Sequence, residues 1–168
     1  MKCTDKEWQH CRVEKMGCSG CYYDERVVYI HYGSKHFNKN LFQDIKNIPF
    51  VKPEGGLWAS RINAKYGWKE WTEDNGYMTN RYREDNYFKF KLKSNAKVLI
   101  LKTKEDLKKL PKNKIPTFQT SYEWLDFEEL QKKYDAIEVV IEKLYWELYG
   151  WDCDSILILN KDVIETNY

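Results

Sequence analysis

The sequence feature that most constrains the fold is the strict alternation of YFKFKLK at residues 87–93. Successive side chains of a strand point to opposite faces, so Phe88, Phe90 and Leu92 fall on one face and three lysines on the other. The pattern predicts a strand with one buried face and one exposed face.

Five further segments are rich in β-branched and aromatic residues and predict strands. They are RVVYIHYG ending at Gly33, the LWAS run after the turn KPEGG at 52–56, KVLILK at 97–102, DAIEVVI at 135–141 and SILILN at 155–160. The Pro and the two Gly residues of KPEGG are typical of a tight turn.

Four segments between these strands predict short helices. They are YGWKEW at 66–71, KEDLKKL at 104–110, YEWLDFEELQKK at 122–133 and EKLYWELY at 142–149. Thr103 and Ser121 are the expected N-caps of the second and third helices, Pro111 ends the second, and Gly150 is the expected C-cap of the fourth. A polar loop is expected between the second and third. The third carries an apolar stripe expected in the core, made of Trp124, Leu125, Phe127 and Leu130.

Six or more strands with inserted helices, and without a regular βαβ rhythm, favour an α+β fold with a mainly antiparallel sheet. A chain of 168 residues is long enough to bury a core without a disulfide or a metal. We expect one domain over residues 26–168, preceded by a short Cys-rich lobe at 1–25.

The charge balance argues against a protein that attracts nucleic acid or membrane by its overall charge. The chain has 28 basic and 26 acidic residues of mixed order and a net charge of +2. Its aromatic content is high, with 13 Tyr, 7 Trp and 7 Phe, which suits core packing or contact with flat ligands.

No run approaches the roughly 18 apolar residues of a membrane span, and the first 15 residues lack the apolar stretch of a secretory signal. A cytoplasmic location is therefore expected.

The N-terminal lobe contains four cysteines that are candidate zinc ligands. They are Cys3, Cys11, Cys18 and Cys21, in the spacing C-x7-C-x6-C-x2-C. Four thiolates can hold zinc tetrahedrally, and His10 is a spare ligand. Strong zinc signals have two tight pairs and this chain has one, so reduced thiols without a metal are the alternative.

Polar residues on two of the predicted strands are candidates for a functional site. His31 shares a strand face with Val27 and Tyr29, so it is either a packed core histidine or a donor that faces a cleft. Gly33 lets a flat ligand reach the backbone without a Cβ in the way. Asp154 precedes a buried strand, where an acid is either a turn residue or, if burial perturbs its acidity, a catalyst.

The order of motifs resembles the ADP-ribosyltransferase superfamily, in the His-containing branch of diphtheria-type toxins and poly-ADP-ribose polymerases. The similar segments are HYGS after the first strand, GGLWAS, the strands FKFKLK and KVLIL as a pair, and finally YDAIEVV with DSILILNKDVI. They cover roughly residues 26–165. The resemblance implies split antiparallel β-sheets with inserted helices and NAD as the substrate.

The resemblance also implies roles for individual residues. His31 binds an NAD ribose, the Gly33 backbone holds the nicotinamide amide, and Asp154 stabilises the positive charge that develops as nicotinamide leaves. Asp152 orients the acceptor. The remaining implied NAD-binding residues are Tyr32, Ser34, Gly56, Trp58, Ser60, Tyr66 and Trp68, of which Trp58 lines the pocket and Tyr66 or Trp68 stacks on the nicotinamide ring.

The sequence departs from the family pattern at three places. Tyr32 is inserted between the His and the Gly, Asp154 stands where the family has Glu, and Asp152 stands where it has Gln or Glu. Three functions are therefore open. The first is an enzyme that transfers ADP-ribose to a protein or nucleic-acid acceptor, or hydrolyses NAD. The second is a binding module on the same fold without catalysis, and the third is a phage or toxin-type inhibitor that occludes a partner.

Overall fold

A single mixed sheet organises the structure, a computed structural model that describes residues 26–49, 51–77, 85–116, 121–148 and 150–167. The N-terminal lobe, with its four predicted zinc ligands, lies outside the described residues. The strands are β1 Val28–Tyr32, β2 Leu57–Arg61, β3 Tyr87–Leu92, β4 Val98–Leu101, β5 Lys112–Pro116, β6 Ser121–Leu125, β7 Ala136–Val139, β8 Ser155–Ile158 and β9 Ile164–Glu165. The α-helices are α2 Trp68–Asn75, α3 Lys104–Leu107 and α4 Phe127–Leu130, and the 3-10 turns are η1 Lys39–Leu41, η2 Ile141–Lys143 and η3 Lys161–Val163.

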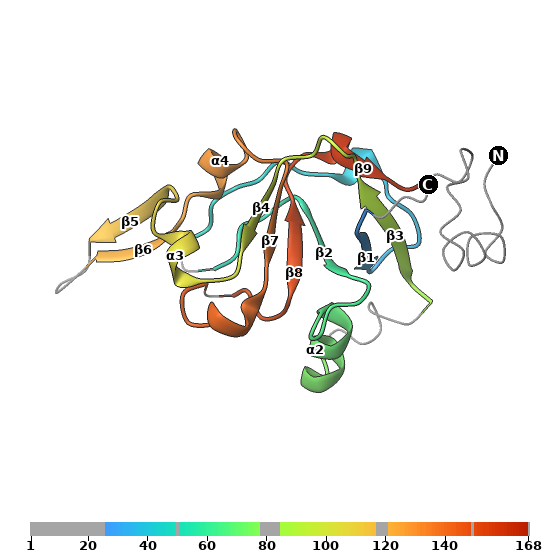
Figure 1. The fold of residues 1–168 in the computed structure, drawn as a ribbon, viewed down its shortest axis with the longest axis horizontal. Helices are drawn as coiled ribbons and strands as arrows, with labels where there is room; N and C mark the ends of the chain where they lie inside the picture. Colours follow the sequence, from blue (N-terminus) through green and yellow to red (C-terminus); the bar gives the residue numbers. More distant parts are fainter. Residues whose placement is uncertain (1–25, 50, 78–84, 117–120, 149, 168) are drawn as a thin grey trace, which may run out of the picture.

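The sheet has the strand order β4-β7-β8-β2-β1-β3-β9, and a separate hairpin, β5-β6, projects from one end of the molecule (Figure 1). Within the described sheet, β4 and β7 run parallel, and every other pair of neighbours is antiparallel. The predicted α+β class is therefore confirmed, and so are all six predicted strands.

Within the interior of the sheet, the pairing between β1 and β2 is the shortest, and only the edge pair β3–β9 is as short. Only two residue pairs join β1 to β2, Tyr29 with Arg61 and Ile30 with Ser60. By contrast, β1 pairs with β3 along five residues, and β2 pairs with β8 from Leu57 to Ala59. The strands β4, β7, β8 and β2 thus form one half of the sheet and β1, β3 and β9 the other. In Figure 1, β4, β7 and β8 lie on one side of β2, and β1, β3 and β9 lie on the other.

A polar cluster around the buried Glu138 carboxylate ties the halves together at the paired end of this junction. Arg61 on β2 binds both carboxylate oxygens of Glu138 on β7, with a 2.7 Å bond from Nη2 to Oε2. The Tyr29 hydroxyl on β1 donates to the same Oε2 at 3.4 Å. Glu138 is only 4% exposed, so the paired guanidinium compensates the cost of burying its charge. Burial, and then the Glu138 charge, raise the pKa of Tyr29, which stays protonated and remains a donor.

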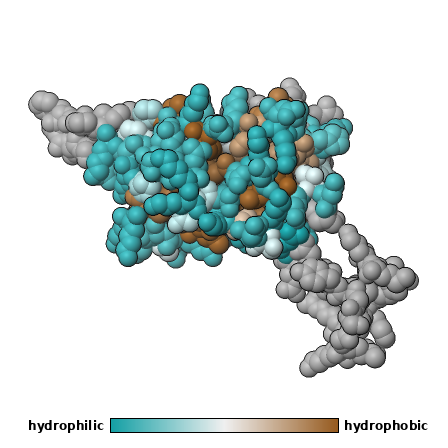
Figure 2. Space-filling model, turned by 90° about the horizontal axis from the view of Figure 1, so that it is seen from above, coloured by the Kyte–Doolittle hydropathy of each residue, from teal (hydrophilic) through white to brown (hydrophobic). Residues whose placement is uncertain are grey.

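Two hydrophobic cores cover the two faces of the sheet. Alternate residues of β7 and β8 belong to different cores, as the strand period of two requires. The leucine-rich core contains Leu101, Leu107, Leu125, Phe127, Leu130, Ile137, Val139, Leu144, Trp151 and Leu157. The phenylalanine core contains Tyr29, Ala59, Phe88, Phe90, Leu92, Ala136, Ile156, Ile158 and Val163. Hydrophilic residues cover most of the face seen in Figure 2, with hydrophobic residues visible between them.

The predicted alternation of 87–93 is confirmed with one exception. Phe88, Phe90 and Leu92 are buried and Lys89 is exposed, but Lys91 is also buried. Its position explains this difference, because β3 is flanked at that residue by both β1 and β9. The expected pairing of 87–93 with 97–102 is wrong. The strand β4 pairs with β7, at the opposite end of the sheet from β3.

The predicted helix at 122–133 is also wrong. Residues 121–125 form β6, which pairs with β5, a segment predicted as a loop. Only Phe127–Leu130 is helical, and its N-cap is Asp126, whose side chain accepts a 3.0 Å bond from the Glu129 N–H. Leu125, Phe127 and Leu130 are nevertheless buried, as their apolar character predicts.

The remaining helix predictions are confirmed in part. The helices α2 and α3 form where expected, with Thr103 as the N-cap of α3 and the Asp106 carboxylate accepting its N–H at 2.8 Å. The helical excursion expected at 142–149 is confirmed only in part, because its described residues form a 3-10 turn, Ile141–Lys143, followed by further turns. Gly150 has the positive φ of 80° expected at the end of such a segment.

Gly56 offers a test of how tightly the chain packs beside β2. A Cβ at this position would lie 2.6 Å from the Ile158 carbonyl oxygen and 2.7 Å from a Leu157 methyl carbon. Gly76 has a similar positive φ, 58° against 65°, but a Cβ there would meet nothing within 4 Å. We expect Gly76→Ala to cost about 1–2 kcal/mol of unfolding free energy from backbone strain alone. Gly56→Ala should cost at least about 1 kcal/mol more, because overpacking is added.

Urea unfolding followed by tryptophan fluorescence measures both costs on the same scale. Equal losses in the two variants would contradict the close approach of β2 and β8 at Gly56.

Candidate functional site

His31 sits where β1 separates from β2. Its Nδ1–H donates a 2.6 Å hydrogen bond to the Trp58 carbonyl, and its ring lies 5.1 Å from the ring of Phe88. Because a carbonyl oxygen only accepts hydrogen bonds, Nδ1 carries a proton. His31 therefore bridges the two halves of the sheet beyond their last paired residues.

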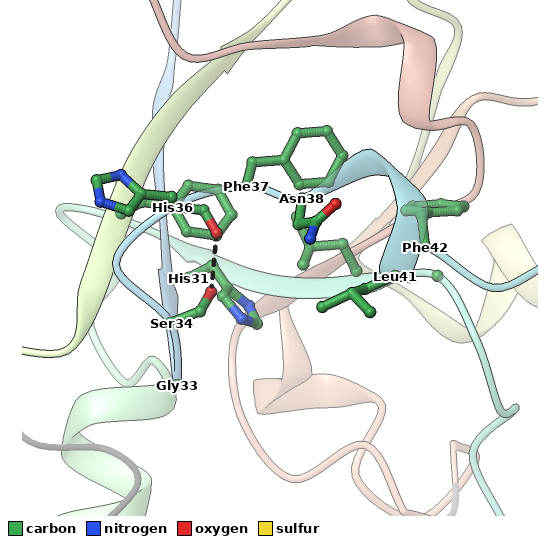
Figure 3. A pocket seen from close by; sticks show the side chains of 11 residues that line it. His31, Gly33, Ser34, His36, Phe37, Asn38, Leu41 and Phe42 are labelled. Carbon is green, nitrogen blue, oxygen red and sulfur yellow. Dashed lines mark hydrogen bonds between the residues drawn. The ribbon is translucent and has the colours of Figure 1, made fainter.

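A pocket of about 290 Å³ opens at this junction (Figure 3). Four residues predicted for NAD binding line it, namely His31, Gly33, Ser34 and Gly56. The other lining residues are His36, Phe37, Asn38, Leu41, Phe42, Leu57 and Phe88. Figure 3 shows Asn38 between the Phe37 ring and Leu41, with the His36 ring directed away from them. The pocket thus combines polar groups from the β1–η1 loop with apolar walls.

The glycines of the pocket are constrained by the chain itself. Gly33 has a φ of 111°, which favours glycine, and its N–H donates to the Asn86 carbonyl at 2.8 Å. In this structure, that N–H is therefore engaged within the protein. Beside Gly56, the space that a Cβ would need is taken by β8 and by Ile45.

A second group of predicted residues is held together on β2, α2 and the start of β8. The Ser60 hydroxyl donates to the Asp154 carbonyl at 2.8 Å and accepts from the Trp68 N–H at 2.9 Å. The Asp154 N–H donates to the Tyr66 carbonyl at 2.8 Å. The structure thus joins Ser60, Tyr66, Trp68 and Asp154 into one hydrogen-bonded group, largely through their backbones.

The Asp154 carboxylate has a structural partner. Its Oδ1 accepts a 2.9 Å bond from the N–H of Ile141, the first residue of η2. This bond matches the first of the two roles expected for Asp154 from the sequence, that of a turn residue. Neither Asp152 nor Asp154 lines the pocket of His31, so the structure does not bring His31 and the two acids into one cavity.

Trp58 and Trp68 form an aromatic cluster that encloses a lysine. Trp58 packs edge-on against Trp68 at 6.4 Å and against Trp151 at 4.7 Å between ring centroids. The Lys52 ammonium lies 5.4 Å from the Trp58 ring and 4.8 Å from the Trp68 ring, within the range of cation–π attraction. Lys52 and Trp151 were not among the residues predicted from the sequence. Lys52 carries no signal of its own, because nothing in a sequence ties one lysine to rings several residues away.

Tyr32 and Asp152 have separate surroundings. Tyr32 is half-buried, lies edge-on to Tyr87 at 6.0 Å, and has a pKa raised chiefly by burial. Asp152 is half-buried beside the fully buried Cys153. Burial raises the pKa of the Cys153 thiol to about 12, and the charges of Asp152 and Asp154 add to this effect.

No group of three or more His, Cys, Asp or Glu side chains within the described part of the chain could hold a metal ion. None of the helices in that part has the length and apolar character needed to cross a membrane. Comparisons of the chain with protein-family models, with curated proteins and with solved structures give no match.

Cys153 should be unreactive in the folded protein. Because burial raises its pKa from 9.0 to about 12, almost no thiolate is present at pH 8. We expect alkylation of Cys153 by iodoacetamide to be at least ~100-fold slower in the native protein than in guanidinium chloride. Peptide mapping by mass spectrometry separates Cys153 from the other cysteines. Rapid native labelling of Cys153 would contradict its burial.

Two substitutions at Asp154 separate its hydrogen bond from its charge. Asp154→Ala leaves the N–H of buried Ile141 without its acceptor and should cost about 1–3 kcal/mol of unfolding free energy. Asp154→Asn keeps an acceptor oxygen and should cost less than half as much. Urea denaturation of both variants measures this, and equal stability of Asp154→Ala and the wild type would show that the bond to Ile141 contributes nothing.

Proposed function

We propose that this chain is an NAD-dependent ADP-ribosyltransferase-like protein with a fold of that type. The observation that supports the proposal best is the pocket at the β1–β2 junction, where His31, the Gly33-Ser34 turn and Gly56 meet. These residues come from the motifs HYGS and GGLWAS, and Gly56 follows Ser34 by 22 positions in the sequence. The final motif, DSILILNKDVI, contains β8, which is the other neighbour of β2.

The residue types suit the cleavage of the nicotinamide–ribose bond. Nicotinamide leaves with the bonding electron pair, positive charge spreads over the ribose, and a fixed carboxylate stabilises that charge. Asp154 is the carboxylate that we propose for this role. The Ile141 N–H fixes one of its oxygens at the start of β8, so its orientation is set before the substrate binds.

The second product depends on the acceptor. An acceptor hydroxyl or amine bonds to the ribose carbon that nicotinamide leaves and loses its proton, and Asp152 is the residue that we propose to orient it. The acceptor is a protein or a nucleic acid, or water if the chain hydrolyses NAD. The aromatic rings of Trp58, Trp68 and Tyr66 are proposed to contact the nicotinamide side. The cytoplasm is the proposed compartment.

One observation favours a second candidate, a binding module without catalysis. Neither acid lines the pocket of His31, and the Asp154 carboxylate already has a backbone partner. A protein that binds NAD or a partner at the junction, and leaves the glycosidic bond intact, would need no acid there.

Release of nicotinamide from labelled NAD tests the enzyme. We expect Asp154→Asn to lower the release rate about 10²–10³-fold, as removal of an electrostatic stabiliser does in other enzymes. Asp162→Asn is the matched control, because Asp162 is an exposed acid on η3 outside the pocket and should leave the rate unchanged. His31→Ala should also lower the rate, because it removes the polar group at the junction.

The outcomes separate the two candidates. Equal release by the wild type, Asp154→Asn and His31→Ala would sink the proposed site. A thermal shift with NAD but no release would favour the binding module, since ligand at 100 times its Kd stabilises the folded state by about 2.7 kcal/mol.

A further inference from the structure

A second hollow, of about 570 Å³, adjoins the pocket at the junction. It shares three wall residues with that pocket, namely His36, Phe37 and Phe88. The rest of its wall comes from Lys35, from Tyr87 and Lys89 on β3, and from Thr166 and Asn167 after β9. A ligand in the hollow would therefore lie next to a nucleotide in the pocket.

The lining of the hollow is basic. Its eight lining residues include two lysines and a histidine, and neither an aspartate nor a glutamate. Lys35 lies 3.9 Å from Asp85, but both side chains are more than half exposed, so this ion pair is weak and leaves Lys35 available to an anion. The hollow is therefore locally positive, although the net charge of the whole chain is only +2.

Aromatic rings lie beside these charges. Tyr87 is 37% exposed, and the Lys89 ammonium lies 5.7 Å from its ring. Phe37 and Phe88 pack with their ring centroids 6.0 Å apart in the wall shared with the pocket. In Figure 3, the His36 ring is directed away from the pocket residues Asn38 and Leu41. Lysines next to accessible flat rings are typical of sites that bind single-stranded nucleic acid, where phosphates meet the charges and bases stack on the rings.

We propose that this hollow binds single-stranded nucleic acid as the acceptor of ADP-ribose. The acceptor role rests on the proposed function, because an acceptor must reach the ribose next to the leaving nicotinamide and the hollow adjoins that pocket. A duplex is disfavoured because its stacked bases hide the faces that Tyr87 would contact. The hydroxyl of Thr166 and the amide of Asn167 add groups that can bond to base edges.

Binding is measured without NAD, so that it does not depend on the proposed reaction. The probe is a fluorescent 12-nucleotide single strand followed by anisotropy at several salt concentrations. The double variant Lys35→Glu/Lys89→Glu should bind at least 10-fold more weakly. Its plot of log affinity against log salt should be shallower by about 1.4, as the loss of two phosphate contacts predicts.

The matched control is Lys108→Glu/Lys132→Glu, which makes the same change in net charge. These lysines are exposed, form ion pairs with Glu105 and Glu129, and lie outside the hollow. The control should keep at least half of the wild-type affinity. An equal loss in both double variants, no binding by the wild type, or equal binding of an acidic peptide or of the duplex would overturn the proposal.

Transfer is then measured with the same oligonucleotide and NAD labelled in its ADP-ribose part. The acceptor role predicts label on the oligonucleotide. It also predicts that Lys35→Glu/Lys89→Glu reduces this label while the rate of NAD hydrolysis by water is unchanged. Nicotinamide release without label on the oligonucleotide overturns that role. Absence of any nicotinamide release is a different result, and it counts against the proposed function itself.

Discussion

The pocket of this structure depends on the short backbone pairing between β1 and β2. Two residue pairs connect the halves of the sheet, and beyond them the strands follow different neighbours. The polar cluster of Tyr29, Arg61 and Glu138 secures the paired end, and the bond from His31 to the Trp58 carbonyl secures the open end. Since the backbone ladder stops between these two points, a pocket can open in the middle of a sheet.

The surroundings of β2 turn this junction into a fixed site. One face of β2 carries Ala59 into the phenylalanine core, and the other carries Trp58 towards the leucine-rich core. Ser60 ties α2 to Asp154, the residue before β8, so the strand, the helix and this one acid form one hydrogen-bonded unit. A ligand at the pocket would meet Phe88 of the phenylalanine core and three residues packed against that core, so this wall is in place before the ligand binds. Such preorganisation is what electrostatic stabilisation of a developing charge requires.

Much of the sheet could be predicted from the sequence, because buried strands leave an alternating or continuous apolar pattern. The hairpin could not. The strand β5, KNKIP, has no apolar period. In β6, Trp124 and Leu125 continue into Phe127 and Leu130 at spacings that also suit a helix. Only the pairing of the two segments makes them strands. The neighbours of β4 could not be predicted either, because strand order depends on long-range packing that short patterns do not encode.

Four of the residues predicted for the candidate site lie together in the structure, and the others do not line the same pocket. Residues near strand ends, such as His31 and Gly56, do meet in one pocket. Contacts that depend on a side chain crossing between elements were not predictable. The Lys52 ammonium between two tryptophans, and the Asp154 carboxylate on the Ile141 N–H, both join segments through geometry alone.

We propose that the β1–β2 junction, where His31 lies, binds the nucleotide. Long-range ¹H–¹⁵N NMR of the histidine side chains tests it most directly, with the signals assigned by a His31→Gln variant. Without ligand, His31 should carry a proton on Nδ1, held by the Trp58 carbonyl. Saturating NAD should shift the Nε2 resonance of His31. A His31 ring without a proton on Nδ1, or a ring whose signals NAD leaves unchanged, would contradict nucleotide binding at this junction.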